Sequence, residues 1–335
     1  MDENVLVSIC CITYNHEKYI RDALDSFLMQ KTNFKYEVII HDDASTDKTQ
    51  DIIREYEKKY PDIIKPIYQK ENQYKKGKKA SSIAFSKAVG KYIALCEGDD
   101  YWINENKLQM QVDYMEKHPN CTFCFHNAKE FFMKENRMTK YIDKNASYGK
   151  YIREDGMYSP DQVMLIGYNG RIPTASFVFR TECIRNLPDW YYTSICGDMP
   201  LKLIITSYGY AHYIDKEMSV YRRQTGISVT DKWEKEKEET EKKIKHIEKF
   251  IDILENFNKF SDFKYSDGIE KIIKYYQVEI LCEKKEYKKI FKSNLRDYYK
   301  DLYNDKYLVK YKIKKYCPII YKIYLKVKGI RNVNK

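Results

Sequence analysis

The chain has 335 residues, of which 43% are hydrophobic and 15% aromatic, and this composition excludes a disordered protein. Its net charge of +11 is unevenly distributed, because residues 306–335 carry ten Lys or Arg and no acid, which leaves +1 for the other 305 residues. The nine cysteines are an odd number and several lie in apolar runs, which favours free thiols and a cytoplasmic protein. With no run of about 18 apolar residues and an acidic N-terminus, we expect neither a membrane span nor a signal sequence.

The first hundred residues alternate between strand and helix patterns. Short apolar runs predict strands over residues 5–12, 37–40, 63–68 and 91–96. Apolar residues at the three-to-four spacing of a helix predict one helix that begins at Tyr19 and a second that ends before Pro61. A third helix is expected over residues 80–89. This alternation predicts an α/β fold with a mostly parallel sheet covered by helices on both faces.

The order loosens after residue 105. The patterns predict a helix over residues 107–117, a strand over 121–125, a mixed stretch over 129–170, a strand over 175–179, a helix over 199–207 and extended chain over 211–221. From residue 231 onward nearly the whole chain has a helix pattern. We therefore predict three parts, two halves of one α/β domain (residues 1–105 and 106–230) and a C-terminal helical region (231–335).

Acidic residues cluster where a doubly wound sheet binds its ligands, at the carboxyl ends of strands. Asp42 and Asp43 follow the second predicted strand, and Asp198 begins a helix; each also suits a turn or a helix cap. The run EGDDYW at residues 97–102 is more informative, because three carboxylates after an apolar strand repel one another unless a cation joins them. Oxygen ligands at this density suit Mg²⁺ or Mn²⁺ bound to a diphosphate.

Other motifs are weaker. Gly77-Lys78 lacks the upstream glycine of a phosphate-binding P-loop, and no G-x-G-x-x-G occurs. Cys121 and Cys124 have His residues nearby, but they lack the second cysteine pair of a typical zinc site and alternate as a half-buried strand does. His16 and His41 are assigned no chemistry.

Three segments together resemble family 2 glycosyltransferases of the GT-A fold, of the type that builds bacterial surface polysaccharides. They are VSICCITYN at residues 7–15, VIIHDDASTD at residues 38–47, and EGDDYW at residues 97–102. The resemblance covers residues 5–228, and the remaining helical extension has no motif that we assign. It implies that residues 1–105 are the nucleotide-sugar-binding half of the domain and residues 106–230 the acceptor-binding half.

The resemblance implies roles for individual residues. Tyr14 matches the position that packs on the nucleotide base, and Asp43 the acid that accepts a hydrogen bond from a uracil N–H. Asp99 and Asp100 match a DXD-type pair, in which Asp99 reaches the ribose side and Asp100 binds the metal on the diphosphate. Asp198 resembles the catalytic base of an inverting displacement. The full set of expected donor-binding residues is Thr13, Tyr14, Asp43, Lys79, Asp99, Arg222 and Arg223.

Two positions depart from the family pattern. A Tyr-Arg-x-His segment often closes over the diphosphate, but here Gln224 stands where His is expected. The loop of residues 75–79 carries lysines where an Arg nearer the helix start is more usual; these lysines either meet phosphate or are solvated.

The basic tail has an amphipathic pattern. Apolar residues recur at spacings of three and four from Ile313 to Val327, with lysines on the other side and Pro318 as a kink. Such a helix suits an anionic membrane surface, or its apolar stripe packs on the body or on a second subunit. Nucleic acid is not an expected partner, because the rest of the chain is nearly neutral.

We therefore predict a metal-dependent (Mn²⁺ or Mg²⁺) inverting glycosyltransferase. It would move a hexosyl or N-acetylhexosaminyl group from a nucleotide sugar, with UDP as the expected nucleotide, to a hydroxyl of a surface glycan or lipid-linked precursor. It would act in the cytoplasm, at the inner face of the membrane if the tail binds lipid. The alternative is a non-catalytic subunit that binds a sugar nucleotide or glycan and partners an active transferase.

Overall fold

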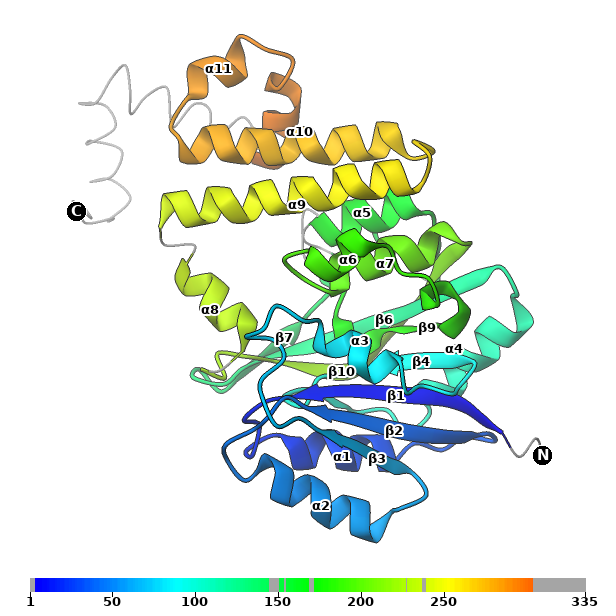
Figure 1. The fold of residues 1–335 in the computed structure, drawn as a ribbon. Helices are drawn as coiled ribbons and strands as arrows, with labels where there is room; N and C mark the ends of the chain where they lie inside the picture. Colours follow the sequence, from blue (N-terminus) through cyan, green and yellow to red (C-terminus); the bar gives the residue numbers. More distant parts are fainter. Residues whose placement is uncertain are drawn as a thin grey trace. The chain divides into compact units, whose positions relative to one another are not determined.

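The structure, a computed structural model, describes residues 4–144, 151–153, 155–168, 172–226, 228–236 and 239–303 (Figure 1). Within these residues ten strands form one sheet. Their bounds are β1 (Val5–Thr13), β2 (Lys35–Asp42), β3 (Ile64–Tyr68), β4 (Tyr92–Leu95), β5 (Tyr101–Trp102), β6 (Cys121–Phe132), β7 (Arg137–Lys140), β8 (Met157–Tyr158), β9 (Val178–Arg180) and β10 (Tyr210–Arg223). The main order is β3-β2-β1-β4-β9-β6-β10-β5, with β7 beside β6 and β8 beside β10.

Helices fill most of the connections between strands. The α-helices are α1 (Ile20–Leu28), α2 (Thr49–Lys59), α3 (Ala80–Phe85), α4 (Lys107–Lys117), α5 (Pro160–Tyr168), α6 (Asp189–Thr193), α7 (Asp198–Ser207), α8 (Val229–Glu236), α9 (Thr240–Phe260), α10 (Ser266–Glu283) and α11 (Tyr287–Phe291). Two short 3₁₀-helices, η2 (Thr174–Ser176) and η3 (Thr181–Ile184), flank β9. The predicted α/β class is confirmed.

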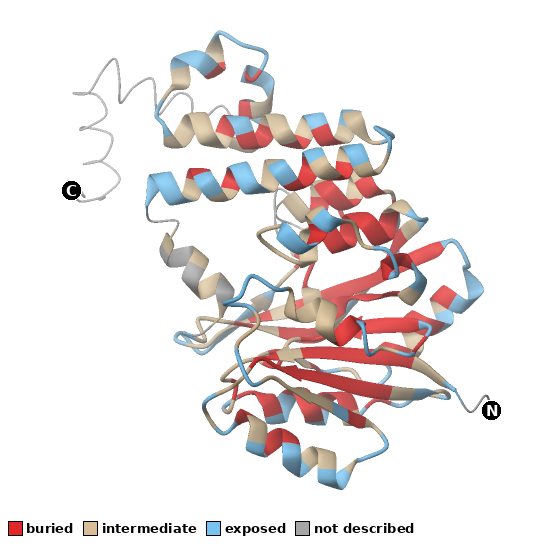
Figure 2. Cartoon of the chain, in the orientation of Figure 1, coloured by how far each residue is buried: buried red, intermediate tan, exposed pale blue. Residues whose placement is uncertain are grey.

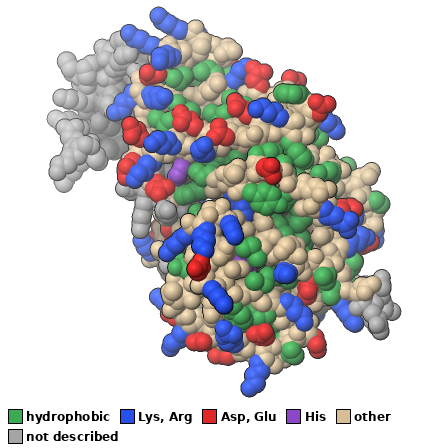
Figure 3. Space-filling model, viewed as in Figure 1, with side chains coloured by type: hydrophobic (Ala, Val, Ile, Leu, Met, Phe, Trp, Pro, Cys, Tyr) green, Lys and Arg blue, Asp and Glu red, His purple; other side chains and the backbone are tan. Residues whose placement is uncertain are grey.

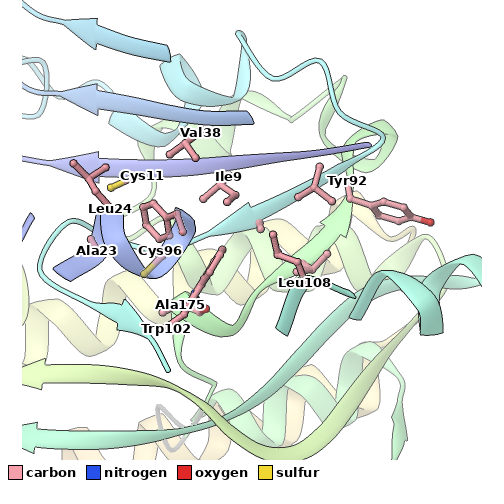
Figure 4. Packing of buried hydrophobic residues seen from close by; sticks show 14 of the residues in the cluster. Ile9, Cys11, Ala23, Leu24, Val38, Tyr92, Cys96, Trp102, Leu108 and Ala175 are labelled. Atoms are coloured by element: carbon pink, nitrogen blue, oxygen red, sulfur yellow. Dashed lines mark hydrogen bonds between the residues drawn. The ribbon is translucent and has the colours of Figure 1, made fainter. Parts of the chain in front are cut away.

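The first half of the sheet is parallel, as the alternation of strands and helices predicts. β1 pairs in parallel with β2 and β4, and β2 with β3. Both faces of β1 are buried (Figure 2). Val7, Ile9 and Cys11 point toward the core beneath α1, α2 and α4, and Figure 4 shows Ile9 and Cys11 beside Val38 and Leu24. Near-continuous apolar strands are expected of a sheet covered on both sides.

Trp102 of β5 packs against α1 and η2. Its side chain is almost fully buried and lies beside Ala175 in Figure 4. Its indole N–H donates to the Ala175 carbonyl (2.8 Å), and its ring contacts Phe27 of α1 edge to face, with centroids 4.9 Å apart. The aromatic end of the EGDDYW motif therefore has a packing role that fixes the turn before it.

The second half of the sheet is mixed. β9 pairs antiparallel with both β4 and β6, whereas β6 and β10 are parallel. The strand expected over residues 175–179 is replaced by η2 followed by β9, because Pro173 precedes a turn in which Ser176 Oγ donates to the Pro173 carbonyl (2.6 Å). Helix α3 ends at Phe85 rather than at residue 89.

The buried cysteines behave as the composition suggests. Among the described residues, six are free thiols in buried positions, and they are Cys10, Cys11, Cys96, Cys121, Cys124 and Cys183. Cys121 and Cys124 belong to strand β6 rather than to a loop. Burial raises the pKa of the Cys121 thiol to about 12, so it stays protonated and unreactive.

The chain divides into two compact units, Met1–Ile269 and Glu270–Lys335, with the boundary inside α10. In the second unit, Val278, Ile290, Leu295 and Tyr299 form a small buried cluster. None of the helices formed by the described residues combines the length and apolar character that a membrane span needs. The three-part division at residues 105 and 230 stays a prediction, and the amphipathic stripe of the tail lies outside the described residues.

Candidate active site

Three loops meet at one edge of the sheet. Residues 14–17 follow β1, residues 43–47 follow β2, and residues 97–100 follow β4. Because these strands are parallel neighbours, their carboxyl ends share an edge, as ligand sites of such sheets require. Most of the predicted donor and metal residues lie here, namely Thr13, Tyr14, Asp43, Asp99 and Asp100.

The loop after β1 is fastened to the loop after β2. Asn15 adopts a left-handed backbone conformation (φ 56°), which Asn tolerates better than most residues. Its main-chain N–H donates to Ser45 Oγ (2.9 Å), and its side-chain oxygen accepts from the N–H of Thr46 (2.7 Å). Tyr14, one residue earlier, is half-buried, so part of its surface is accessible to a ligand.

Asp43 is buried and already engaged by main-chain donors. One carboxylate oxygen accepts from the N–H of Gln73 (2.6 Å) and the other from the N–H of Tyr74 (3.0 Å). An ionised carboxylate has about four acceptor positions, so two remain for a nucleotide base. The sequence left the lysines of residues 75–79 as phosphate contacts or solvated side chains. The structure shows that the main chain of the basic loop (residues 69–79) supports Asp43, through Gln73 and Tyr74.

The turn after β4 is packed closely on the end of β1. Gly98 donates from its N–H to the Ile12 carbonyl (2.9 Å), and a Cβ at this position would come within 3.0 Å of atoms of Thr13 and His16. Only glycine fits such an approach. His16 Nε2 lies 3.9 Å from Asp99 Oδ2, so a histidine that the sequence left without a role borders the acidic turn. The sequence indicated His16 only by its position directly after the segment VSICCITYN at residues 7–15.

The carboxyl groups of this turn perturb one another. Burial, followed by the charges of Asp99 and Asp198, raises the pKa of Glu97 to about 8. Burial and the neighbouring Asp99 and Glu97 also raise the pKa of Asp100 well above its usual range. Glu97 Oε2 is buried and has no hydrogen-bond partner among the described residues. Such a crowded group of carboxylates fits a cation, which would stabilise their ionised forms.

The described residues hold no cluster of three or more His, Cys, Asp or Glu side chains arranged to hold a metal ion. Asp100 would therefore act with few other protein ligands. Mg²⁺ commonly binds in this way, with one or two carboxylates and the remaining positions filled by phosphate oxygens and water. The residues present thus fit a metal that arrives with a diphosphate.

Arg222 of β10 binds the acidic turn (residues 97–100) through both its main chain and its side chain. Its main-chain N–H donates to Asp100 Oδ1 (2.9 Å), and its guanidinium donates to the Asp99 carbonyl (2.8 Å) and to Asp22 of α1. The guanidinium also lies 4.4 Å from the ring centre of Tyr101. These contacts give Arg222 a positioning role, and its predicted contact with the donor stays a prediction.

Arg223 and Gln224 contact residues outside the acidic turn. Arg223 Nη1 lies 3.6 Å from Glu130 Oε1 on the neighbouring strand β6. Gln224 has a left-handed backbone conformation (φ 63°), and its N–H donates to Asp231 (3.1 Å) at the start of α8. Gln224 Oε1 is buried and has no hydrogen-bond partner among the described residues. The donor role of Arg223 also stays a prediction.

Asp198 reaches the same edge from a distant part of the chain. It is the first residue of α7, and its side chain is 40% exposed, with the nearly buried Lys202 Nζ 4.0 Å away. Its charge contributes to the raised pKa of Glu97, which places the two carboxylates in one electrostatic site. Lys79 Nζ donates to the carbonyl of Cys196 (2.9 Å), two residues before Asp198. The structure therefore places Lys79 against the segment that carries Asp198.

The profile described as "Glycosyl transferase family 2" matches residues 8–180. An uncharacterized protein of Mycobacterium tuberculosis is 49% identical over 127 residues, which are 38% of this chain and 36% of that protein. An Escherichia coli protein named UDP-Glc:alpha-D-GlcNAc-diphosphoundecaprenol beta-1,3-glucosyltransferase WfgD is 31% identical over 157 residues, 46% of this chain and 58% of WfgD. This chain thus matches only part of the length of either relative.

Two solved structures share the fold. Staphylococcus aureus TarS in complex with UDP has a TM-score of 0.57 at 17% identity, covering 83% of this chain and 72% of that one. A mannosyltransferase from Pyrobaculum calidifontis, in complex with GDP-Man and Mn²⁺, has a TM-score of 0.54 at 16% identity, covering 84% and 74%. The predicted glycosyltransferase fold is thereby confirmed.

Proposed function

This chain belongs to glycosyl transferase family 2, and we propose that it transfers a hexosyl or N-acetylhexosaminyl group from a UDP-sugar, with inversion, to a hydroxyl of a lipid-linked glycan precursor. That the protein is a glycosyltransferase follows from the family; the donor, metal, stereochemistry and acceptor are the proposal. The observation that carries it is the position of Asp198, whose charge reaches Glu97 although about a hundred residues separate them.

The nucleotide end of the site supports a uridine donor. Asp43 keeps two acceptor positions beside its two main-chain bonds, and a uracil ring offers one N–H donor to such a carboxylate. Tyr14 leaves part of its surface open for stacking on the base. Binding of UDP by TarS, which has the same fold, is consistent with this choice.

Asp99 and Asp100 would hold the sugar nucleotide at its ribose and diphosphate. A divalent cation bound at Asp100, Mn²⁺ or Mg²⁺, would offset the negative charge that develops on the departing UDP. The main-chain bond from Arg222 holds Asp100 Oδ1, which orients the carboxylate before the donor binds. A cation at Asp100 would relieve the repulsion from Asp99 and Glu97 that, together with burial, raises the pKa of Asp100.

Asp198 would act as the general base. Its partly exposed carboxylate would accept the proton of the acceptor hydroxyl as the oxygen attacks the anomeric carbon and the bond to UDP breaks on the opposite side. One carboxylate is enough, because UDP leaves as an anion and needs no proton from the enzyme. The product has inverted configuration.

The acceptor is proposed from the relatives and from the charge of the tail. WfgD is named for transfer to a sugar on diphosphoundecaprenol, a lipid-linked acceptor. The ten basic residues of segment 306–335 would hold this chain at the anionic surface where such acceptors lie, at about 1 kcal/mol per lysine near the lipid. We therefore propose a peripheral protein at the inner face of the cell membrane.

The test is sugar transfer by the purified protein with Mn²⁺ or Mg²⁺, across UDP-, GDP- and dTDP-sugars. Asp198→Asn should lower kcat by about 100- to 10,000-fold, the usual contribution of a general base. Asp189→Asn is the matched control, because Asp189 is an exposed acid that also begins a helix, α6. Unchanged transfer in Asp198→Asn would remove Asp198 from the base role. UDP binding without turnover on any donor would favour the non-catalytic alternative.

A further inference from the structure

The segment that precedes Asp198, residues 194–197, is bound by a lysine at the start of α3. Lys79, the N-cap residue of α3, donates from Nζ to the main-chain carbonyls of Ser194 and Cys196. Building on the proposed function, we propose that Lys79 is a positioning residue for Asp198, rather than a ligand of the donor diphosphate.

Residues 194–197 form the short connection between α6 and α7, and the carbonyls of Ser194 and Cys196 in it accept from side-chain donors instead of helical N–H groups. Lys79 donates to both carbonyls, and Ser194 Oγ lies 2.8 Å from the Cys196 carbonyl as well. Gly197, the N-cap residue of α7, has no side chain to cap the helix, and its carbonyl accepts from the N–H of Leu201 (3.2 Å). Lys79 is the group from outside this segment that binds two of its carbonyls, so its ammonium group contributes to the entry angle of α7 and to the direction of Asp198.

A second contact supports the same junction. Ser81 Oγ in α3 lies 3.3 Å from the hydroxyl of the buried Tyr191 in α6. The first turn of α3 thus touches the α6–α7 segment at two points. Loss of one contact should loosen the segment without unfolding it.

Lys79 differs from the lysines around it. Lys75 and Lys78 of the same loop are exposed, whereas Lys79 is half-buried and uses two of its three donors on carbonyls. Burial lowers the pKa of Lys79, and the neighbouring Cys196 and Asp198 act in the opposite direction. Figure 3 shows Lys and Arg side chains scattered over the face that it draws. Among the loop lysines, Lys79 is set apart by its two bonds to main-chain carbonyls.

The other end of the same loop binds the carboxylate proposed to recognise uracil. Gln73 and Tyr74 donate to the Asp43 carboxylate, and Asn72 Nδ2 donates to the Asp43 carbonyl (3.0 Å). Residues 72–79 therefore connect the base-recognition residue to the segment that carries the general base. Lys79 completes that connection at its C-terminal end.

The experiment compares Lys79→Met with Lys78→Met, which removes the same charge from the adjacent, exposed position. Lys79→Met should lower kcat by about 10- to 100-fold, since a misplaced catalytic group costs up to about 100-fold, while the Kd for UDP changes by less than about threefold. Lys79→Arg should recover most of kcat, because it keeps donors for both carbonyls. Lys78→Met should keep the wild-type kcat. A rise in Kd and KM for the donor with unchanged kcat would overturn the proposal in favour of a phosphate contact.

Amide hydrogen exchange separates this inference from the proposed function. Exchange in residues 194–199 should be faster in Lys79→Met than in wild type or Lys78→Met, with the rest of the first unit unchanged. Absence of turnover by the wild-type protein on every donor would refute the proposed function alone. Unchanged exchange in residues 194–199 of Lys79→Met would refute the positioning role, whatever the activity.

Discussion

Replacing Gly98 by alanine tests how closely the acidic turn is packed on the end of β1. A Cβ at this position would lie 2.6 Å from Thr13 Oγ1, 2.8 Å from Thr13 Cβ and 2.9 Å from His16 Nδ1. Carbon atoms in contact prefer separations of about 3.5–4.0 Å, so something must move. The turn carries Asp99 and Asp100, and its displacement would move both of them.

The neighbours cannot retreat easily. Thr13 is fully buried, and its carbonyl accepts from the N–H of Asp43 (2.9 Å). The His16 carbonyl accepts from the N–H groups of Tyr19 and Ile20 (both 2.9 Å) at the start of α1. The Cβ and Oγ1 atoms of Thr13 lie next to its fixed main chain and cannot move away freely. We therefore expect overpacking to lower the free energy of unfolding by about 1–3 kcal/mol.

Urea denaturation measures the stability, and calorimetry with UDP and Mn²⁺ measures the effect on the site. Gly98→Ala should lower both the free energy of unfolding and the affinity for UDP. Gly197→Ala is the control, because its Cβ would meet no atom closer than 3.8 Å, and it should change stability by at most about 0.5 kcal/mol. If Gly98→Ala keeps wild-type stability and UDP affinity, the reasoning from close packing is refuted.

Three further outcomes are expected. Lys107 is fully buried, with Nζ 4.0 Å from the ring centre of Trp102, and burial lowers its pKa to about 7. An unfolded lysine keeps its proton to about pH 10.4, so between about pH 7 and 10 the unfolded state binds more protons and the free energy of unfolding should rise with pH. Lys107→Met should remove this rise and stabilise the protein at pH 7 by about 1–4 kcal/mol, and an unchanged pH slope in urea titrations would contradict it. Asp100→Asn should abolish the Mn²⁺-dependent part of the rise in Tm that UDP causes, and a wild-type rise would exclude Asp100 as the metal ligand. Deleting residues 306–335 should leave hydrolysis of the donor largely intact and reduce sedimentation with anionic liposomes; loss of folding on deletion would instead assign the apolar stripe of the tail to a packed core.

The sequence determined the local features of this protein. Strand and helix periods, and acids placed directly after apolar strands, predicted the parallel half of the sheet and the three loops at its edge. Short motifs such as EGDDYW carry this information because β1, β2 and β4 are neighbours, so residues that follow them must meet. The composition likewise indicated buried thiols, six of which lie in the described core.

Tertiary structure decided the contacts between distant segments. No periodicity shows that Lys79 donates to the Cys196 carbonyl, that the guanidinium of Arg222 is shared by Asp22 and the Asp99 carbonyl, or that Asp43 is bound by the basic loop. These contacts join residues at least 30 positions apart, and all but the contact between Arg222 and Asp22 use a main-chain atom, which every residue type carries. The residue types therefore do not reveal these contacts. Only the folded chain shows which Lys and Arg side chains are bound within the protein.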